Sequence, residues 1–360
     1  MRTAIPLALV AQSFFASLVL AETASVPFVS LKGYDLKKSH VIQNLPPTTD
    51  QGSLPWCFAH AAATVFNYYV CRDLKQDCSR VPRNELASPL DITRYTVPPG
   101  ESDILDYVSS YPDINIASGS AIVTLEISAL FVGTVASQAC APQEEFFIGT
   151  GKTGKGIGTE VVLSQTRTVD QLKAFYTRYA KGCDEQCITL ALDELGKVLP
   201  NYKTDGPTLS RALKKESFSG FITRLAIPNT CALAKNRSYF ESDDYSMNVA
   251  PKTAKEKLSY ARYSKELVNA IKQDNPVIIE GICLTPKKNG QCAEMHALVA
   301  YGYAQLCDVN ECRTGLKLRS SWGEDWQRAA DDLWYDAESL YNASSRAETA
   351  LGWLSKKPKQ

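Results

Sequence analysis

The sequence predicts an α+β fold, with helices in most of the first two thirds of the chain and antiparallel strands in the last third. A helix-length apolar segment follows Cys57, and amphipathic segments recur at 169–179 and 187–199. From residue 265 onward the pattern changes to β-branched and alternating segments, which are typical of strands. A hydrophobic content of 44% is ample for a large core, so we expect a folded protein rather than a disordered chain.

The first 21 residues have the pattern of a secretory signal. Arg2 supplies a short positive region, an apolar stretch runs from Ile5 to Leu20, and Ala21 provides a small residue for cleavage. An uncleaved membrane anchor is the less favoured alternative, because Gln12 interrupts a stretch that is already short. We expect an exported protein without stable membrane insertion. Secretion, a periplasm and a lysosome-like organelle all fit this pattern.

The segment from Gln51 to Cys57 combines the parts that a thiol hydrolase needs. Cys57 lies six positions after Gln51 and opens the apolar segment. With Ser53 as N-cap and Pro55 in the first turn, Cys57 is expected in the first turn of a buried helix, where the helix dipole lowers a thiol pKa. Gln51, on the loop before it, is placed to donate a hydrogen bond to a developing oxyanion.

Two further helices are expected before residue 145. Residues 85–95 have a rough helical spacing of apolar side chains, but Pro89 is tolerated only if the helix begins near it. Residues 117–120 precede an apolar, helix-like stretch that runs to Phe131.

Residues 146–255 are expected to form a helical insertion. A glycine-rich run at 147–158 indicates a surface loop. It lacks the spacing of a phosphate-binding loop, and no apolar strand leads into it, so that function is rejected. Amphipathic helices are expected at 169–179, at 187–199 and from near Thr208. The sequence assigns no function to this insertion.

Three antiparallel strands are expected after a helix that closes at 266–274. They are 276–282, which contains a β-branched run, 297–304, and the alternating segment 316–319. His296 stands at the start of the second strand and Ser320 at the end of the third. Because neighbouring strand ends meet in an antiparallel sheet, we expect these two side chains to lie together.

The eleven cysteines fit an oxidising compartment. Proximity in the sequence suggests four pairs and leaves a fifth between distant residues, although sequence alone does not prove connectivity. The suggested pairs are Cys71–Cys78, Cys183–Cys187, Cys283–Cys292, Cys307–Cys312 and Cys140–Cys231. Cys57 is left as the odd cysteine, which independently favours a working thiol.

Charge and composition exclude several other functions. Lys+Arg and Asp+Glu are equal at 39 each, so no basic surface indicates a nucleic-acid partner. Only three histidines are present and ten cysteines can pair, so we expect no metal and no cofactor. We expect a monomer.

Three segments together resemble the papain-like (C1-type) cysteine peptidases. They are the Gln51–Cys57 segment, the strand that begins at Met295-His296, and the run Arg319-Ser320-Ser321-Trp322-Gly323, and they occur in the family's order. The resemblance covers roughly 35–145 and 255–330. It implies a two-lobed fold, with the signal at 1–21, a helical lobe with the nucleophile at 22–145, the insertion at 146–255, and a β-rich lobe with the histidine at 256–360.

The resemblance also implies roles for particular residues and a peptide or protein substrate. Cys57 would be the nucleophile and His296 the general base and acid. Gln51 would stabilise the oxyanion, and Trp322 would cover the histidine. Ser118 and Gly119 correspond to a glycine-rich strip that lines the substrate cleft. Ser320 stands where the family usually has Asn, and a serine is a shorter orienter of the imidazole, so we expect reduced activity.

Two other functions stay open on the same scaffold. A non-catalytic binding protein is one alternative, because Ser320 replaces the Asn that usually orients the imidazole. A thiol acyltransferase or amidase is the other, and it would use the same nucleophile as a peptidase. His60, one turn beyond Cys57, is interpreted as a hydrogen-bonded core histidine rather than as the catalytic base.

Overall fold

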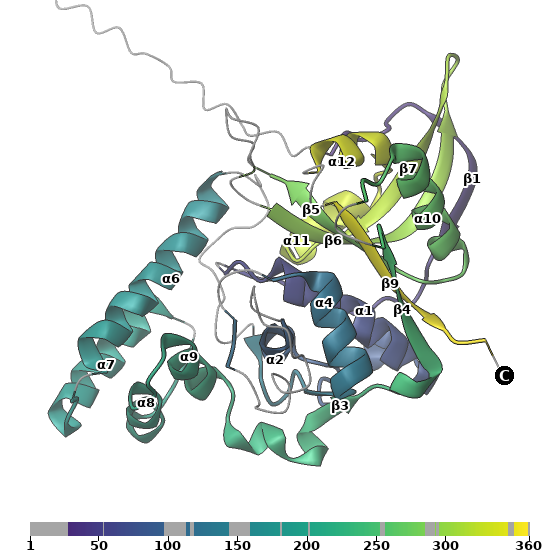
Figure 1. The fold of residues 1–360 in the computed structure, drawn as a ribbon. Coiled ribbons are helices and arrows are strands. Elements are labelled where there is room, and N and C mark those ends of the chain that lie inside the picture. Colours follow the sequence, from purple (N-terminus) through teal and green to yellow (C-terminus); the bar gives the residue numbers. More distant parts are fainter. Residues whose placement is uncertain are drawn as a thin grey trace, which may run out of the picture.

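The computed structural model describes residues 28–52, 54–96, 113–115, 119–143, 159–180, 182–200, 202–252, 256–284, 292, 295–344 and 349–358. The regular elements of these residues are helices, one large antiparallel sheet and one small antiparallel strand pair, so the α+β class is confirmed (Figure 1). The expected signal at 1–21, Ser53, Ser118 and the glycine-rich run at 147–158 lie outside the described residues.

Helix α1, Cys57–Leu74, is the central helix of the molecule. Small residues such as Ala59 and Ala62 are fully buried in it, so neighbouring elements pack close to its backbone. The expected N-cap at Ser53 is wrong, because α1 begins at Cys57 and Trp56 is its N-cap. A tight turn, in which the Leu54 amide donates to the Gln51 carbonyl, holds Pro55 outside the helix and delays its start.

Short helices and a small strand pair surround α1. The elements are η1 (Cys78–Arg80), α2 (Pro89–Ile92), η2 (Thr93–Tyr95), α4 (Ala121–Glu126), η3 (Ile127–Val132) and β2 (Thr134–Ala136). The helix expected at 85–95 is shorter than its pattern indicated. Ser88 accepts a hydrogen bond from the Leu90 amide as N-cap, and Pro89 takes the first helical position, so the helix cannot extend backward from there.

Four helices follow in the region of the expected insertion, where Figure 1 places them at the lower left. They are α6 (Thr159–Tyr179), α7 (Glu185–Val198), α8 (Gly206–Leu213) and α9 (Phe218–Ala226). Asp184, Asp205 and Ser217 cap the last three through their side chains. Irregular segments lead back to the sheet through η4 (Asn229–Ala232), η5 (Ala234–Asn236), β3 (Arg237–Tyr239), which pairs with β2, and η6 (Ser242–Asp244).

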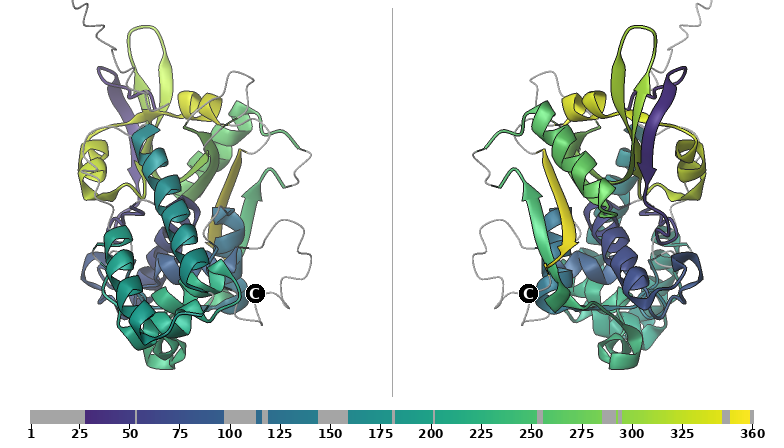
Figure 2. Two further views of the ribbon diagram at one scale, coloured as in Figure 1. Left: turned by 90° about the vertical axis from the view of Figure 1, so that its left-hand side faces the viewer. Right: turned by 90° about the vertical axis from the view of Figure 1, so that its right-hand side faces the viewer.

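The large sheet has seven strands in the order β4-β9-β5-β6-β7-β8, with β1 also paired to β6. Its strands are β1 (Asp35–Val41), β4 (Tyr245–Ala250), β5 (Val277–Cys283), β6 (Met295–Cys307), β7 (Cys312–Arg319), β8 (Tyr335–Asp336) and β9 (Ala350–Lys356). The three expected strands are neighbours, as β5, β6 and β7. Figure 2 shows the β6–β7 hairpin with β1 along it. Helices α10 (Tyr260–Lys272), α11 (Gly323–Asp331) and α12 (Ala337–Ala343) flank the sheet.

All five expected disulfides are present, and Cys57 keeps its thiol. The Cys140–Cys231 disulfide spans 91 positions and ties η4 to the chain beyond β2. Within the described residues, no helix has both the length and the apolar character needed to cross a bilayer.

Candidate active site

The loop before α1 is joined to the chain beyond β7 by backbone hydrogen bonds. The Gln51 amide donates to the Ser321 carbonyl at 2.9 Å, and Asp50 forms an antiparallel bridge with Trp322. Gly323 has a φ of +79°, and a Cβ there would lie 2.9 Å from the Asp50 carboxylate, so this close approach requires glycine. The loop carrying Gln51 is therefore fixed against the segment carrying Ser320 and Trp322.

The Gln51 side chain is buried and held at both ends of its amide. Its Nε2 donates to the Leu54 carbonyl at 2.8 Å, and its Oε1 accepts from the Ser321 hydroxyl. A primary amide has two N–H groups, so the bond to Leu54 leaves one N–H for another acceptor. The Gln51 side chain is therefore held in one orientation, and these hydrogen bonds use only one of its two N–H groups.

Cys57 is the first residue of α1 and is half-buried. This confirms its expected place in the first turn. The first N–H groups of a helix have no partner within the helix, and their partial positive charge favours an anion at this end. A thiolate at Cys57 is stabilised by that position, and partial exposure leaves the sulfur open to reagents.

His296 lies at the second position of β6 and is 4% exposed. Its Nε2 is 3.1 Å from the Ser320 hydroxyl, so the expected meeting of these two strand ends is confirmed. The Trp322 ring stacks on the imidazole with 4.2 Å between centroids and 8° between planes. Because Ser320 engages Nε2, a reaction with a thiol has to use Nδ1.

Burial lowers the pKa of His296 from 6.5 to about 3, with a smaller contribution from His60. A charge on the buried His296 is therefore unfavourable unless a negative group lies beside it. His60 lies one turn beyond Cys57 on the same face of α1.

His60 supports the loop before α1. Its Nδ1 is 2.6 Å from the Thr49 hydroxyl, and it is almost completely buried, as expected for a core histidine. Burial lowers its pKa to about 3, and the Gln143 amide offsets only a small part of that effect. Gln143 in turn donates to the Asp50 carbonyl at 3.1 Å. Sequence reasoning missed Thr49 and Gln143, because neither stands in a recognisable pattern.

Gly119 lies against the residue that follows the thiol. A Cβ at Gly119 would be 2.4 Å from the Thr96 hydroxyl and 2.9 Å from the Phe58 ring, so no larger residue fits without a shift. The next residue, Ser120, donates to the Glu280 carboxylate on β5 at 3.0 Å, which ties the start of α4 to the sheet. Gly119 thus lies against Phe58, the residue after Cys57, whereas Ser118 lies outside the described residues.

No family model matches the chain, and no curated protein matches it either. Solved structures give distant similarities. A recombinant stem bromelain precursor is 13% identical, with 90% of this chain and 72% of that chain covered and a TM-score of 0.41. Digestive procathepsin L 3 of the Tenebrio molitor larval midgut is 12% identical, with 92% and 74% covered and a TM-score of 0.41. Xylellain, a cysteine protease from Xylella fastidiosa, is 13% identical, with 91% and 88% covered and a TM-score of 0.39. At TM-scores near 0.4, similarity of this kind does not extend to activity.

Proposed function

We propose that this protein is an exported papain-like cysteine peptidase that hydrolyses peptide bonds through a thioester on Cys57. The observation that carries the proposal is the joining of the Gln51 loop to the Ser320–Trp322 segment, with His296 bound to Ser320 and stacked on Trp322. These contacts support a site in which the Cys57 thiol, the His296 imidazole and the Gln51 amide act together.

The reaction proceeds in two halves. Cys57 Sγ attacks the peptide carbonyl carbon while His296 accepts the thiol proton, and a tetrahedral oxyanion forms. His296 then returns that proton to the leaving amine as the C–N bond breaks, which leaves an acyl-thioester. A water molecule attacks the thioester with His296 as base, and the carboxylic acid product leaves as the thiol is restored.

The burial of His296 determines which of the two groups, the Cys57 thiol or the His296 imidazole, carries the shared proton. A lone charge on the buried imidazole is unfavourable, as the lowered pKa of His296 indicates. A thiolate next to an imidazolium has no net charge and is further favoured by the N-terminus of α1. We therefore expect the two groups to titrate as a coupled pair rather than separately.

The oxyanion is stabilised by two N–H donors. One is the second N–H of Gln51, and the other is the backbone N–H of Cys57, which lies at the helix end. Losing one such donor typically costs about 3 kcal/mol of transition-state stabilisation.

In the papain-like family an Asn side chain usually orients the imidazole, whereas here Ser320 and Trp322 together orient the imidazole of His296. Ser320 reaches the imidazole Nε2 through its hydroxyl, and the Trp322 stack restricts rotation of the ring and covers it from water. The hydroxyl bond to a neutral ring contributes only about 1 kcal/mol. A working but slower enzyme is the expected result.

Export and an oxidising compartment are part of the proposal. Ten of the eleven cysteines form disulfides, a usage that is rare in reducing compartments. The secretory pattern of residues 1–21 supports the same placement.

The direct test is hydrolysis of a denatured protein and of a fluorogenic peptide library by residues 22–360, with the Cys57→Ser variant as control. Cleavage by the wild type that the variant lacks supports the peptidase. Turnover that rises with added amine at constant peptide concentration would favour an acyltransferase. If the protein cleaves no substrate and Cys57 reacts no faster than an ordinary thiol, a non-catalytic binding protein is the remaining alternative.

A further inference from the structure

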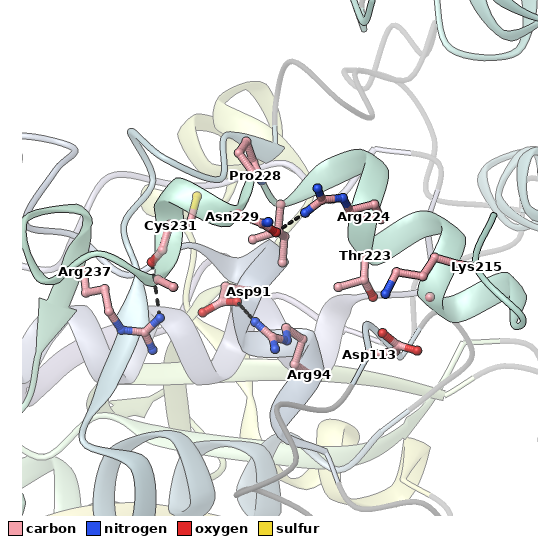
Figure 3. A pocket seen from close by; sticks show the side chains of 13 residues that line it. Asp91, Arg94, Asp113, Lys215, Thr223, Arg224, Pro228, Asn229, Cys231 and Arg237 are labelled. Atoms are coloured by element: carbon pink, nitrogen blue, oxygen red, sulfur yellow. Dashed lines mark hydrogen bonds and ion pairs between the residues drawn. The ribbon is translucent and has the colours of Figure 1, made fainter. Parts of the chain in front are cut away.

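A charged cavity of about 410 Å³ lies between the helical lobe around α1 and the end of α9. Figure 3 shows Arg224 and Asn229 on one side of it, and Asp91 and Arg94 on the other. None of the described candidate active-site residues lines this cavity. Its size falls within the range of small-molecule sites.

The described residues of the lining carry more positive than negative charge. Among them, four cationic side chains face two carboxylates, an excess of two positive charges. They are Arg94, Lys215, Arg224 and Arg237 against Asp91 and Asp113.

Arg94 and Asp91 form a neutral pair in the floor. Arg94 Nη1 donates to Asp91 at 2.9 Å, and both side chains are at least nine-tenths buried. Asp91 also accepts from the Ala136 amide at 2.7 Å, so it is fully engaged by the protein. This pair is neutral and fixed in place, so the excess positive charge of the lining comes from the other cationic side chains.

Arg237 and Arg224 are bonded only to neutral oxygens within the described residues. Arg237 donates to the Thr134 hydroxyl at 2.9 Å and to the Thr134 and Cys231 carbonyls. Arg224 donates to the Asn229 amide oxygen. These bonds orient the two guanidinium groups but do not neutralise their charge. Lys215 forms no ion pair with any described carboxylate.

We propose that this cavity binds a small organic anion that carries at least two negative charges on phosphate or carboxylate groups. Positively charged side chains lose hydration in a cavity, and a bound anion compensates for that loss. Guanidinium groups match phosphate and carboxylate oxygens in geometry, and such charge-assisted hydrogen bonds are the stronger kind. Two negative charges balance the excess of the lining.

The walls of the cavity come from segments far apart in the sequence, so an occupant would join them. Asp91 and Arg94 belong to α2 and η2, whereas Arg224 belongs to α9. The Cys140–Cys231 disulfide fixes one edge, because Cys231 lines the cavity. Binding therefore stabilises the docking of α9 and raises the melting temperature. This inference does not depend on the peptidase proposal.

The test is isothermal titration calorimetry of residues 22–360 with pyrophosphate and, separately, with citrate, at an ionic strength held constant with sodium chloride. The informative variant is Lys215→Gln/Arg224→Gln, since these side chains are exposed or half-buried and their loss should not unfold the chain. The matched control is Arg178→Gln/Lys197→Gln, which removes two positive charges from α6 and α7, outside the cavity.

We expect saturable binding to the wild type and the control, and affinity at least tenfold weaker in the Lys215→Gln/Arg224→Gln variant. Binding of pyrophosphate alone assigns a phosphate ligand, and binding of citrate alone assigns a carboxylate. The proposal is overturned if neither anion binds saturably, if the cavity variant binds as tightly as the wild type, or if the control loses as much affinity. A thermal shift with each anion provides the second readout, and it should be absent from the cavity variant.

Discussion

The candidate active site and the cavity beside α9 differ in the charge of their titratable side chains. In the candidate active site, burial lowers the pKa of both His60 and His296, and each ring is within hydrogen-bond distance of an uncharged hydroxyl group. In the cavity, Arg224 and Arg237 stay charged, although their bonds are also to neutral oxygens. A histidine can shed its proton to avoid a buried charge, whereas an arginine cannot.

This difference separates the chemistry that each region supports. A neutral imidazole beside a thiol can accept and return a proton within one catalytic cycle. Permanently charged guanidinium groups cannot exchange protons near neutral pH, but they can attract and orient an anion. Under the two proposals, proton transfer would belong to the first region and anion recognition to the second.

The largest effect is expected from removing the thiol–imidazole pair. Cys57→Ser and His296→Ala should each lower kcat/KM for peptide hydrolysis at least about a thousandfold, because the proposed mechanism uses this thiol as the nucleophile and this imidazole as the base. Met295→Leu, at an exposed position next to His296, is the control and should keep near wild-type activity. Substantial activity in Cys57→Ser would place the chemistry elsewhere.

Gln51→Ala should lower kcat about a hundredfold by removing one oxyanion donor. Gln51→Glu keeps the size of the side chain but lacks the N–H, so a similar loss is expected in both variants. The measurement is kcat and KM on one peptide substrate, with KM little changed. If Gln51→Glu retained full kcat, Gln51 would not be a donor in the transition state.

The two buried histidines should make the protein sensitive to acid. Their pKa values are lowered to about 3 in the folded state from 6.5, so their contribution to stability is complete above pH 6.5 and is lost as the pH falls toward 3. In that window each adds on the order of 1 kcal/mol per pH unit to the slope of unfolding free energy.

His60→Asn keeps an amide near Thr49 and removes one titrating ring. Urea unfolding between pH 7.5 and 4.5 should therefore show a smaller slope in this variant than in the wild type. An equal slope in both proteins would mean that His60 is not held neutral by burial.

The smallest effect is expected at Ser320. Ser320→Ala should lower kcat about tenfold or less, because it removes one hydroxyl bond of about 1 kcal/mol while the Trp322 stack remains. Rate constants measured across pH separate a loss of orientation from a shift in the imidazole titration. A loss as large as that of His296→Ala would show that the stack contributes little to orientation.

The sequence was informative where the pattern is local. The apolar run after Cys57, the β-branched strand β5 and the four short disulfides each depend on residues close in the chain, and all were predicted correctly. The meeting of His296 and Ser320 followed from strand ends in an antiparallel sheet.

Elements that depend on distant partners were missed. Strands β1 and β4 are mostly exposed or half-buried and gain their structure by pairing with β6 and β9, far along the chain. The charged cavity brings Arg94 and Arg237 together across 143 positions, and no local pattern marks either residue. The start of α1 at Cys57 depended on turn hydrogen bonds that a capping pattern does not reveal.

The most direct measurement is the pH dependence of Cys57 alkylation by iodoacetamide, in the wild type and in His296→Ala. The proposed pairing of Cys57 with His296 predicts that the wild-type rate stays high well below pH 8 and that the variant loses this reactivity. If both proteins instead follow an ordinary thiol titration near about pH 8.5, the thiol and imidazole do not act as a pair, which contradicts the proposed catalytic site.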